Sequence, residues 1–439
     1  MFFETLQSAS YVGYKERRDN LIEKIKEAYP QVKDGVVLLF AGFEKPDVLF
    51  RQESSFYYFT GIKDPGVALM IDMQKKSVLY VPNCFEERAR WACSSLQPTD
   101  ERAKSLNLEK IELLGKSIKG YNIFPYFDKS EYENVISVLA SHVKGGGNLF
   151  VLNPNNSYQY VEQRFVLDRL KLFVPEIKGE NLFDISAVVS QMRRAKNIFD
   201  IGKISDAINI TLLAQEAAAN AIKDRALEFE VQAAAEYVFT ASGASRAFPT
   251  IVASGKNATI LHYTDNDDQV DDGELVLVDL GADLDHYCGD ITRTYPASGN
   301  FTDRQKELYN IVLETQKYIA SIAKPGYFLV NKDEPEKSLQ HLAKAFLKEK
   351  GYDQYFVHGI GHYLGLDVHD VGFLKDPLQD GDVITIEPGI YIPDENLGIR
   401  IEDNYWVTKQ QTICLSEMFP KELEDIEELM KTGSALIEK

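Results

Sequence analysis

Two stretches of this 439-residue chain echo each other, and they constrain its fold more than any other feature. The first, DDGELVLVDLG, covers residues 271–281, and the second, QDGDVITIEPG, covers residues 379–389. In each stretch an Asp-Gly turn precedes a run of aliphatic and β-branched residues, and a carboxylate stands at the sixth residue after the glycine. These carboxylates are Asp279 and Glu387. The pattern predicts that the chain builds the same carboxylate-bearing strand twice.

Each stretch is followed by a second strand-like segment that carries another acid. Asp290 lies in GDITRTYP, and Glu402 lies in GIRIEDNYWV. A charged side chain inside a buried strand is unfavourable unless it is paired or binds a cation. Four inward-facing carboxylates cannot neutralise one another, whereas hard divalent ions favour oxygen ligands. We therefore expect two carboxylate-bearing hairpins that hold a pair of metal ions.

Length and charge exclude several classes of protein. The length suggests two or three domains, and the balance of 48 basic against 67 acidic residues gives a net charge of -19, which argues against a nucleic-acid partner. No apolar run approaches the roughly 18 residues that span a membrane, and the first residues do not resemble a signal peptide. The cysteines lack C-x-x-C spacing, which predicts reduced thiols in a cytoplasmic protein. They are Cys84, Cys93, Cys288 and Cys414.

The first 172 residues read as an α/β domain. An aromatic-rich segment at residues 50–66 is interpreted as a strand packed in the core, and Gly145–Gly147 as a turn before a strand, because the Lys-Ser/Thr of a phosphate-binding loop is missing. The predicted helices of this domain cover residues 15–28, 132–142 and 158–172. Its other predicted strands cover residues 36–41, 68–71, 78–81 and 149–152.

Residues 173–186 are interpreted as a linker to a catalytic domain at residues 187–439. Beyond the linker, Ile201, Ile204, Ile208 and Leu212 form a helical stripe. Thr302 and Gln305 match a capping box before another helix, and a further helix is expected at about 337–350. Because helices flank each echoing stretch, we expect a duplicated strand-and-helix unit with a shared site between its halves.

Three of the seven histidines fall within twelve residues, in the segment HGIGHYLGLDVHD. They are His358, His362 and His369. A lone histidine is usually a structural residue, but this cluster lies among glycines and just ahead of the second carboxylate stretch. One imidazole added to four carboxylates gives an oxygen-rich ligand set, which suits Mn, Co or Fe better than a thiolate-rich structural zinc site.

The segments VDLGA, DITRTYP, HGIGHYLGLDVHD, TIEPGIY and IRIED resemble the ligand motifs of the pita-bread metallopeptidase superfamily, which includes methionine aminopeptidase, prolidase and aminopeptidase P. The resemblance covers about residues 186–410 and fills every ligand position in order. It implies an amino-terminal creatinase/prolidase-like α/β domain followed by a pseudo-twofold α+β catalytic domain. It also implies two divalent ions, with Mn²⁺ expected and Co²⁺, Fe²⁺ or Zn²⁺ as alternatives. The implied metal ligands are Asp279, Asp290, His362, Glu387 and Glu402.

The resemblance assigns further roles around the ions. Asp279 would bind one ion and His362 the other, while Asp290 and Glu402 would bridge both. Glu387 would also handle the proton of the attacking water. The other implied catalytic or substrate-binding residues are His262, His358, His369 and Arg400, and Tyr363 is a candidate for substrate binding.

Several polar residues are expected to lie outside the site. His286 and its neighbours in the turn between the first two acids are interpreted as a solvated hairpin loop, and they comprise Asp283, Asp285, His286 and Cys288. His142 and His341 lie on predicted helices without acidic partners, so we expect surface or packing roles for them.

The amino-terminal domain argues against a minimal methionine aminopeptidase, which would lack it. The segments FRQESSFYYFTG and YKERRDNL are more similar to aminopeptidase P, which cleaves before proline in longer peptides, than to prolidase, which cleaves dipeptides. Prolidase is the alternative, and a non-catalytic binding protein is disfavoured because all five ligand positions are filled. The resemblance implies peptides with proline in the second position as partners, no membrane or nucleic acid, and a homodimer or homotetramer.

Overall fold

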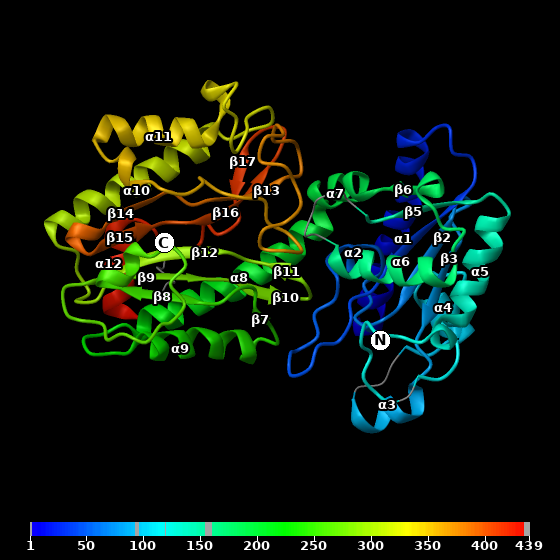
Figure 1. Ribbon diagram of the computed structural model, residues 1–439. Helices are drawn as coiled ribbons and strands as arrows, with labels where there is room; N and C mark the ends of the chain where they lie inside the picture. Colours follow the sequence, from blue (N-terminus) through cyan, green and yellow to red (C-terminus); the bar gives the residue numbers. More distant parts are fainter. Residues whose placement is uncertain (1, 93–95, 119, 154–159, 434–439) are drawn as a thin grey trace. The chain divides into compact units, whose positions relative to one another are not determined.

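The computed structural model describes residues 2–92, 96–118, 120–153 and 160–433 (Figure 1). The chain divides into two compact units, Met1–Arg193 and Arg194–Lys439, which are described separately. No helix within the described ranges is both long and apolar enough to cross a membrane.

The first unit is built on one mixed sheet with the strand order β4-β3-β2-β1-β5-β6. The central strand β1 pairs antiparallel with β2 and parallel with β5. The predicted turn at Gly145–Gly147 lies directly before β5, as expected. The strands are β1 Gly35–Phe40, β2 Ala68–Asp72, β3 Ser77–Val81, β4 Lys110–Leu113, β5 Asn148–Val151 and β6 Leu182–Asp184. The helices are α1 Phe2–Ala28, α2 Ser54–Thr60, α3 Phe85–Trp91, α4 Asp100–Ser105, α5 Glu133–Lys144, α6 Val161–Phe173 and α7 Ser186–Arg194, which ends one residue beyond the unit.

The aromatic-rich segment at residues 50–66 contains the buried helix α2, Ser54–Thr60, so the predicted strand was wrong. The side chain of Glu53 caps α2 by accepting hydrogen bonds from the backbone N–H groups of Ser55 and Phe56. Gly61 ends it in the left-handed conformation, with φ of 65°. Every residue of α2 is buried, so its apolar residues show no one-sided periodicity. A short run that is apolar all round does not distinguish a buried helix from a buried strand.

Removal of the α2 cap should destabilise the first unit. Glu53→Ala is expected to lower the free energy of unfolding by about 1–2 kcal/mol, because two first-turn N–H groups lose their acceptor. Urea denaturation followed by circular dichroism measures the loss. The control Glu86→Ala removes an exposed acid from the first turn of α3 and should have a smaller effect. Equal losses in the two variants would contradict a capping role for Glu53.

The stretch at residues 173–186 is part of the first unit rather than a separate linker. Its strand β6 pairs in parallel with β5, with Leu182 opposite Leu149. Ile185 is fully buried and donates its backbone N–H to Val151 O. Pro175 and Gly179 suggested a connecting segment, but the backbone hydrogen bonds to β5 place the following residues at the edge of the sheet.

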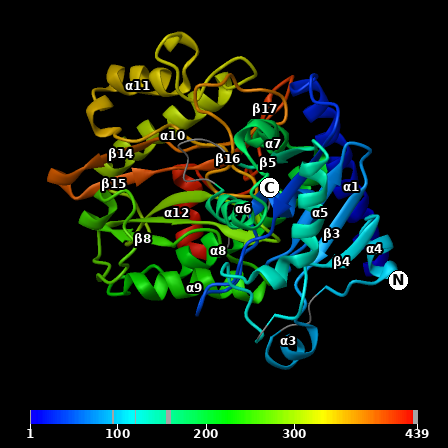
Figure 2. The same cartoon turned by 45° about the vertical axis from the view of Figure 1, so that its right-hand side comes forward.

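The second unit places helices on both sides of its strands. Figures 1 and 2 show α10 and α11 on one side and α8 and α9 on the other. The capping box of Thr302 and Gln305 at the start of α10 is present as predicted. The helices are α8 Ile198–Ala221, α9 Glu228–Ala241, α10 Asp303–Ile322, α11 Leu339–Lys350 and α12 Leu423–Thr432. The strands are β7 Ser245–Arg246, β8 Ile251–Ser254, β9 Leu275–Leu280, β10 Ala282–Leu284, β11 Tyr287–Cys288, β12 Ile291–Pro296, β13 Val383–Ile386, β14 Gly389–Ile392, β15 Leu397–Arg400, β16 Asp403–Val407 and β17 Thr412–Cys414.

The two echoing stretches become strands β9 and β13, but their pairing differs in detail. Strand β9 pairs antiparallel with β12, which places Asp279 opposite Thr292. Strand β13 pairs antiparallel with β16, while β14 and β15 form a separate two-stranded ladder. Glu402 therefore lies between two strands of the second half rather than within one. The mixed α/β first unit and the duplicated second unit agree with the fold class that the sequence predicts.

Candidate metal centre

Four carboxylates from separate strand ends meet in the second unit. Asp279 lies near the end of β9, Asp290 directly before β12, Glu387 directly after β13, and Glu402 between β15 and β16. The residues Asp279, Asp290 and Glu402 are 8%, 4% and 2% exposed. His362 Nε2 lies 3.4 Å from Asp290 Oδ2 and 3.6 Å from Glu387 Oε1. Ligand atoms of Asp290, His362 and Glu402 all lie within 4.8 Å of one another.

Three oxygens of this cluster have no hydrogen-bond partner among the described residues, although they are buried. They are Asp279 Oδ1, Asp290 Oδ1 and Glu402 Oε1. Buried carboxylate oxygens are normally satisfied, so three unpaired ones in a single cluster call for a cation. The donor set of carboxylates with one imidazole is one that divalent ions accept. The residues therefore fit a metal centre.

The remaining oxygens are held in place by neighbouring side chains. Arg400 Nη2 donates to Asp279 Oδ2 at 2.7 Å. Thr292 Oγ1 donates to Glu402 Oε2 at 2.7 Å, and Thr385 Oγ1 donates to Glu387 Oε1 at 3.3 Å. Each of these acids thus has one oxygen fixed by a neighbour. For Asp279 and Glu402 the second oxygen is left for a metal ion, and such partners orient ligands and tune the metal.

The backbone holds His362 beside Glu387. The segment around His362 runs along β13, where Thr385 N donates to His362 O and Glu387 N donates to Ile360 O, both at 2.9 Å. The ring atom Nδ1 of His362 lies 3.1 Å from Tyr363 O. A proton on Nδ1 satisfies that carbonyl and leaves the lone pair of Nε2 for a metal ion, which is the usual arrangement for a histidine ligand.

Burial and the neighbouring carboxylates disfavour ionisation of the acids in this cluster. Burial raises the pKa of Asp290 well above its ordinary value, and the charges of Asp279 and Glu387 raise it further. Burial and the charge of Asp290 raise the pKa of Glu402 in the same way, and burial raises the pKa of Glu387. Because like charges at short range oppose ionisation, bound divalent cations would reverse these shifts.

A second group of side chains surrounds the acids. His358 Nε2 lies 2.9 Å from the hydroxyl of Tyr391, which accepts a hydrogen bond from Arg400 Nη1 at 2.8 Å. His358 Nδ1 lies 3.7 Å from Glu387 Oε2, and the rings of His362 and His369 are 4.1 Å apart. Asp279, Arg400, Tyr391 and His358 therefore form one hydrogen-bonded chain that ends beside Glu387.

Burial keeps these histidines neutral. Burial and the charge of Arg400 lower the pKa of His358 to about 3, and burial with the neighbouring histidines lowers the pKa of His369 to about 4. Burial raises the pKa of Tyr391 to about 12. Neutral imidazoles and a protonated phenol can act as hydrogen-bond donors without adding charge to the site.

Comparison with known proteins decides the family. The model of "Metallopeptidase family M24" matches residues 202–409, and that of "Aminopeptidase P, N-terminal domain" matches residues 14–113. An Xaa-Pro aminopeptidase from Haemophilus influenzae is 30% identical over 449 residues, which covers 95% of this chain and 96% of the relative. The chain belongs to metallopeptidase family M24. Its first unit is of the aminopeptidase P type.

Two further comparisons bear on this M24 peptidase. The solved structure of aminopeptidase P from Escherichia coli with the inhibitor Pro-Leu has a TM-score of 0.79 and is 28% identical, covering 96% of this chain and 98% of that one. An Xaa-Pro dipeptidase from Pyrococcus furiosus is 40% identical over 367 residues, which covers 82% of this chain and 90% of the relative. Both comparisons support the pita-bread metallopeptidase fold that the sequence predicts.

The M24 fold gathers most of the residues that the sequence singled out. The five expected ligands lie together, and His358, His369 and Arg400 adjoin them. His262 is exposed, and its charge contributes to the lowered pKa values of both His358 and His369. Tyr391 was not identified from the sequence as a site residue, although it follows Glu387 closely in the segment TIEPGIY. Its side chain is identified only by its contacts with Arg400 and His358.

Tyr363 is the exception among the expected residues. Its side chain is 1% exposed and belongs to the hydrophobic core, and its ring lies under the guanidinium of Arg194 at 4.8 Å. Alternate residues of an extended segment face opposite sides, so Tyr363 points away from the side that carries His362. A buried ring cannot line an open substrate pocket, and the structure therefore argues against the predicted role.

The turn between Asp279 and Asp290 is less exposed than predicted. The residues Asp283, His286 and Cys288 are buried, at 9%, 6% and 1% exposed. The short strands β10 and β11 pair across this turn, so it is a packed element rather than a solvated loop. His142 and His341 lie outside the site as expected, in contact with Asn148 O and Ser338 Oγ.

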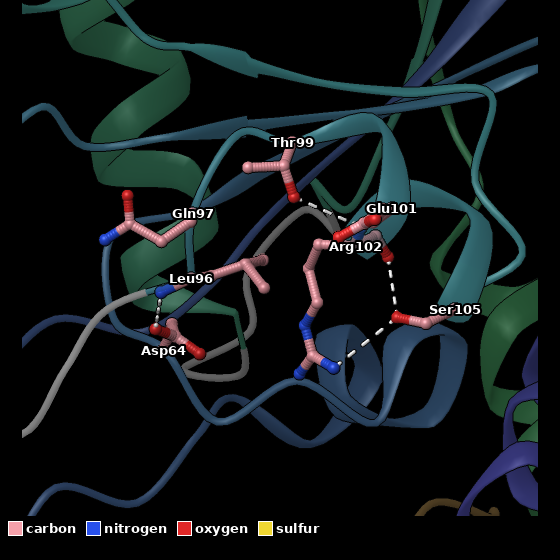
Figure 3. A pocket seen from close by; sticks show the side chains of 7 residues that line it. All are labelled: Asp64, Leu96, Gln97, Thr99, Glu101, Arg102 and Ser105. Atoms are coloured by element: carbon pink, nitrogen blue, oxygen red, sulfur yellow. Dashed lines mark hydrogen bonds between the residues drawn. The ribbon is translucent and has the colours of Figure 1, made fainter.

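A cavity of about 640 Å³ lies in the first unit of this M24 peptidase (Figure 3). None of the predicted site residues lines it. It is lined by Asp64, Leu96, Gln97, Thr99, Glu101, Arg102 and Ser105.

Proposed function

We propose that this chain is a metal-dependent Xaa-Pro aminopeptidase, which releases the amino-terminal residue of peptides that carry proline in the second position. The observation that carries the proposal is the cluster of three unpaired buried carboxylate oxygens beside His362 Nε2. Its relatives in family M24 with the same domain pair support the reaction class.

We assign the metal ligands within this proposal. Asp279 would hold one ion and His362 the other, Asp290 and Glu402 would contribute to both, and Glu387 would be the remaining ligand. The oxygen-rich donor set with one imidazole favours Mn²⁺, with Co²⁺, Fe²⁺ or Zn²⁺ as alternatives. The open oxygens on Asp279, Asp290 and Glu402 support this assignment.

The chain's own groups supply positioning and proton transfer. A bound pair of divalent ions supplies Lewis acidity and lowers the pKa of water to about 7. Glu387 is proposed to take the water proton, because its Oε1 lies 3.6 Å from His362 Nε2 and the carboxylate therefore adjoins the metal centre. His358 and Tyr391 position the groups around the site. The one proton of the neutral His358 ring lies on Nδ1, 2.8 Å from Gly359 O, so Nε2 accepts a hydrogen bond from the Tyr391 hydroxyl.

Proline sets a particular chemical demand at this site. An X-Pro bond is a tertiary amide, so its nitrogen has no hydrogen and must gain a proton as it leaves. We propose that Glu387 returns the water proton to that nitrogen, and that His262 and His369 hold the substrate around it. The exposure of His262 supports a substrate contact.

Xaa-Pro dipeptidase is the second candidate, because the relative from Pyrococcus furiosus is 40% identical over 367 residues. Metal-loaded enzyme should be given Ala-Pro and Ala-Pro-Ala separately, and released alanine should be measured. We expect efficient cleavage of the tripeptide and slow or no cleavage of the dipeptide. Cleavage of Ala-Pro with none of Ala-Pro-Ala would establish the dipeptidase and refute the aminopeptidase.

We also propose a cytoplasmic location and a homodimer or homotetramer. The four cysteines of the sequence lack C-x-x-C spacing, which supports a reducing compartment. The large negative net charge argues against nucleic-acid partners. The Xaa-Pro aminopeptidase relatives support peptides as substrates.

A further inference from the structure

Two buried glutamines occupy matching places in the two halves of the second unit. Gln215 lies on α8 and Gln316 lies on α10, and both are 0% exposed. Each turns its side-chain amide towards the backbone of the ligand-bearing strands rather than towards the ligands themselves. A buried amide offers two N–H donors, which is enough to join two carbonyls from different strands.

In the first half, Gln215 joins the strands of Asp279 and Asp290. Its Nε2 donates to Val278 O at 3.2 Å and to Ile291 O at 2.7 Å. Val278 directly precedes Asp279, and Ile291 directly follows Asp290. One side chain therefore fixes the carbonyl group of a residue next to each of the two ligands.

In the second half, Gln316 does the same for Glu387 and Glu402. Its Nε2 donates to Ile386 O at 3.2 Å and to Ile401 O at 3.1 Å, and each of these residues directly precedes a ligand. A third acceptor, Asp403 Oδ2, lies 3.1 Å from the same nitrogen. Three acceptors around one atom fix which end of the amide carries the hydrogens.

The side-chain carbonyl oxygens of the two glutamines differ in their hydrogen bonding. This difference indicates which atoms of the amide group are useful at these positions. Gln215 Oε1 accepts a hydrogen bond from the hydroxyl of Tyr295 at 2.8 Å. Gln316 Oε1 has no partner among the described residues. A buried acceptor without a donor is destabilising. An apolar side chain such as methionine would avoid that penalty, so the benefit of Gln316 lies in its donors.

We propose that Gln215 and Gln316 are a matched pair of positioning residues that keep the four carboxylates converged for the two metal ions. The proposal rests on the metal-dependent function proposed above. Without metal, the clustered acids repel one another, because carboxylate oxygens of the buried Asp290 and Glu402 lie within 4.8 Å of each other. By joining two strands within each half, the glutamines oppose the separation that this repulsion favours, so the site is preorganised before metal binds.

The test compares Gln215→Met and Gln316→Met with wild type in the full chain. Mn²⁺ alone is titrated by calorimetry, and the two-metal complex is examined by electron paramagnetic resonance. We expect each variant to bind Mn²⁺ about 10–100-fold more weakly, the range seen when partners of metal ligands are removed. The resonance spectrum should also change, because the distance between the ions affects their magnetic coupling.

Thr315→Val is the matched control. Thr315 is as buried as Gln316 and adjoins it on α10, but among the described residues its hydroxyl bonds only to Ile311 O of its own helix. It should keep the wild-type affinity and spectrum. The glutamine variants could instead melt at lower temperatures while their Mn²⁺ affinity and spectrum stay unchanged. That result would show that both residues contribute only to core packing, and it would overturn the proposal.

A milder variant covers the case in which the methionine variants do not fold. Tyr295→Phe removes only the hydroxyl that orients Gln215 and should weaken Mn²⁺ binding about fivefold, the scale of one lost hydrogen bond. Unchanged affinity in Tyr295→Phe would then refute the role of Gln215. If wild type itself bound no Mn²⁺, the proposed metal-dependent function would fail, which is a different result from equal affinities in wild type and variants.

Discussion

Replacing Glu402 with alanine is expected to abolish metal binding and peptide hydrolysis together. Glu402 is 2% exposed, and its Oε2 is held by Thr292 while its Oε1 has no partner. As a proposed bridge it would contact both ions, so its loss affects both binding positions. Activity should fall by at least about three orders of magnitude, because the loss exceeds that of a single electrostatic contact to the transition state.

In the metal-free protein, the same substitution should not lower thermal stability. The pKa of Glu402 is raised by burial and by Asp290, so the acid is unfavourable there without a cation. Metal-free Glu402→Ala should therefore melt at least as high as metal-free wild type. Wild type should gain about 2.7 kcal/mol of stability when metal is present at 100-fold above its Kd, and the variant should gain none.

Thermal melts with and without Mn²⁺, together with calorimetry, measure both effects. Glu228→Gln is the control for loss of a buried acid, since Glu228 is 0% exposed and accepts hydrogen bonds from Ser254, Asn257 and Tyr263. It should destabilise the fold and still bind metal. An active Glu402→Ala enzyme that binds metal normally would show that the ligand assignment is incorrect.

His358→Ala is expected to keep both metal ions and to turn over about 10²–10³-fold more slowly. Its imidazole contacts Tyr391 and Glu387, but it contributes no atom to the group formed by Asp290, His362 and Glu402. The substitution therefore removes the acceptor of the Tyr391 hydroxyl and a neighbour of Glu387 without removing a proposed ligand. The effect should lie mainly in kcat, because the neighbouring Glu387 is proposed to transfer the proton during the chemical step rather than to bind the substrate.

Steady-state kinetics on Ala-Pro-Ala and Mn²⁺ calorimetry separate these two effects. His341→Ala is the matched control, because His341 lies on α11 and contacts Ser338 Oγ outside the site. It should leave kcat and metal affinity near the wild-type values. An unchanged kcat in His358→Ala would remove His358 from the mechanism, whereas loss of metal would make it a ligand.

The sequence predicted the ligand-bearing strands well because strong local signals coincide there. Asp-Gly turns precede β9 and β13, and an acid inside an apolar run is visible without any structure. The capping box at Thr302 marked the start of α10 for the same reason, since both partners lie within three residues. Features that depend only on residues close in sequence can be predicted without a tertiary structure.

The prediction failed where the answer depends on what surrounds a segment. The aromatic run of α2 has no periodicity because all its faces are buried, so propensity could not separate a helix from a strand. Tyr363 adjoins His362 in sequence, yet the extended backbone turns the two side chains to opposite sides. The turn from Asp283 to Cys288 is polar in composition and nevertheless packed.

The sequence by itself determined which residue types could bind metal and the order in which they occur, because a buried acid must be compensated whatever its neighbours are. Only the tertiary structure decided which oxygens remain open. That choice depends on Arg400 and Thr292, which reach Asp279 and Glu402 from other strands and occupy one oxygen each. Thr385 occupies one oxygen of Glu387 from two residues earlier in the same segment. Tyr391, Gln215 and Gln316 likewise acquire their contacts only when strands and helices distant in sequence pack together, since a hydrogen bond depends on distance and angle in space.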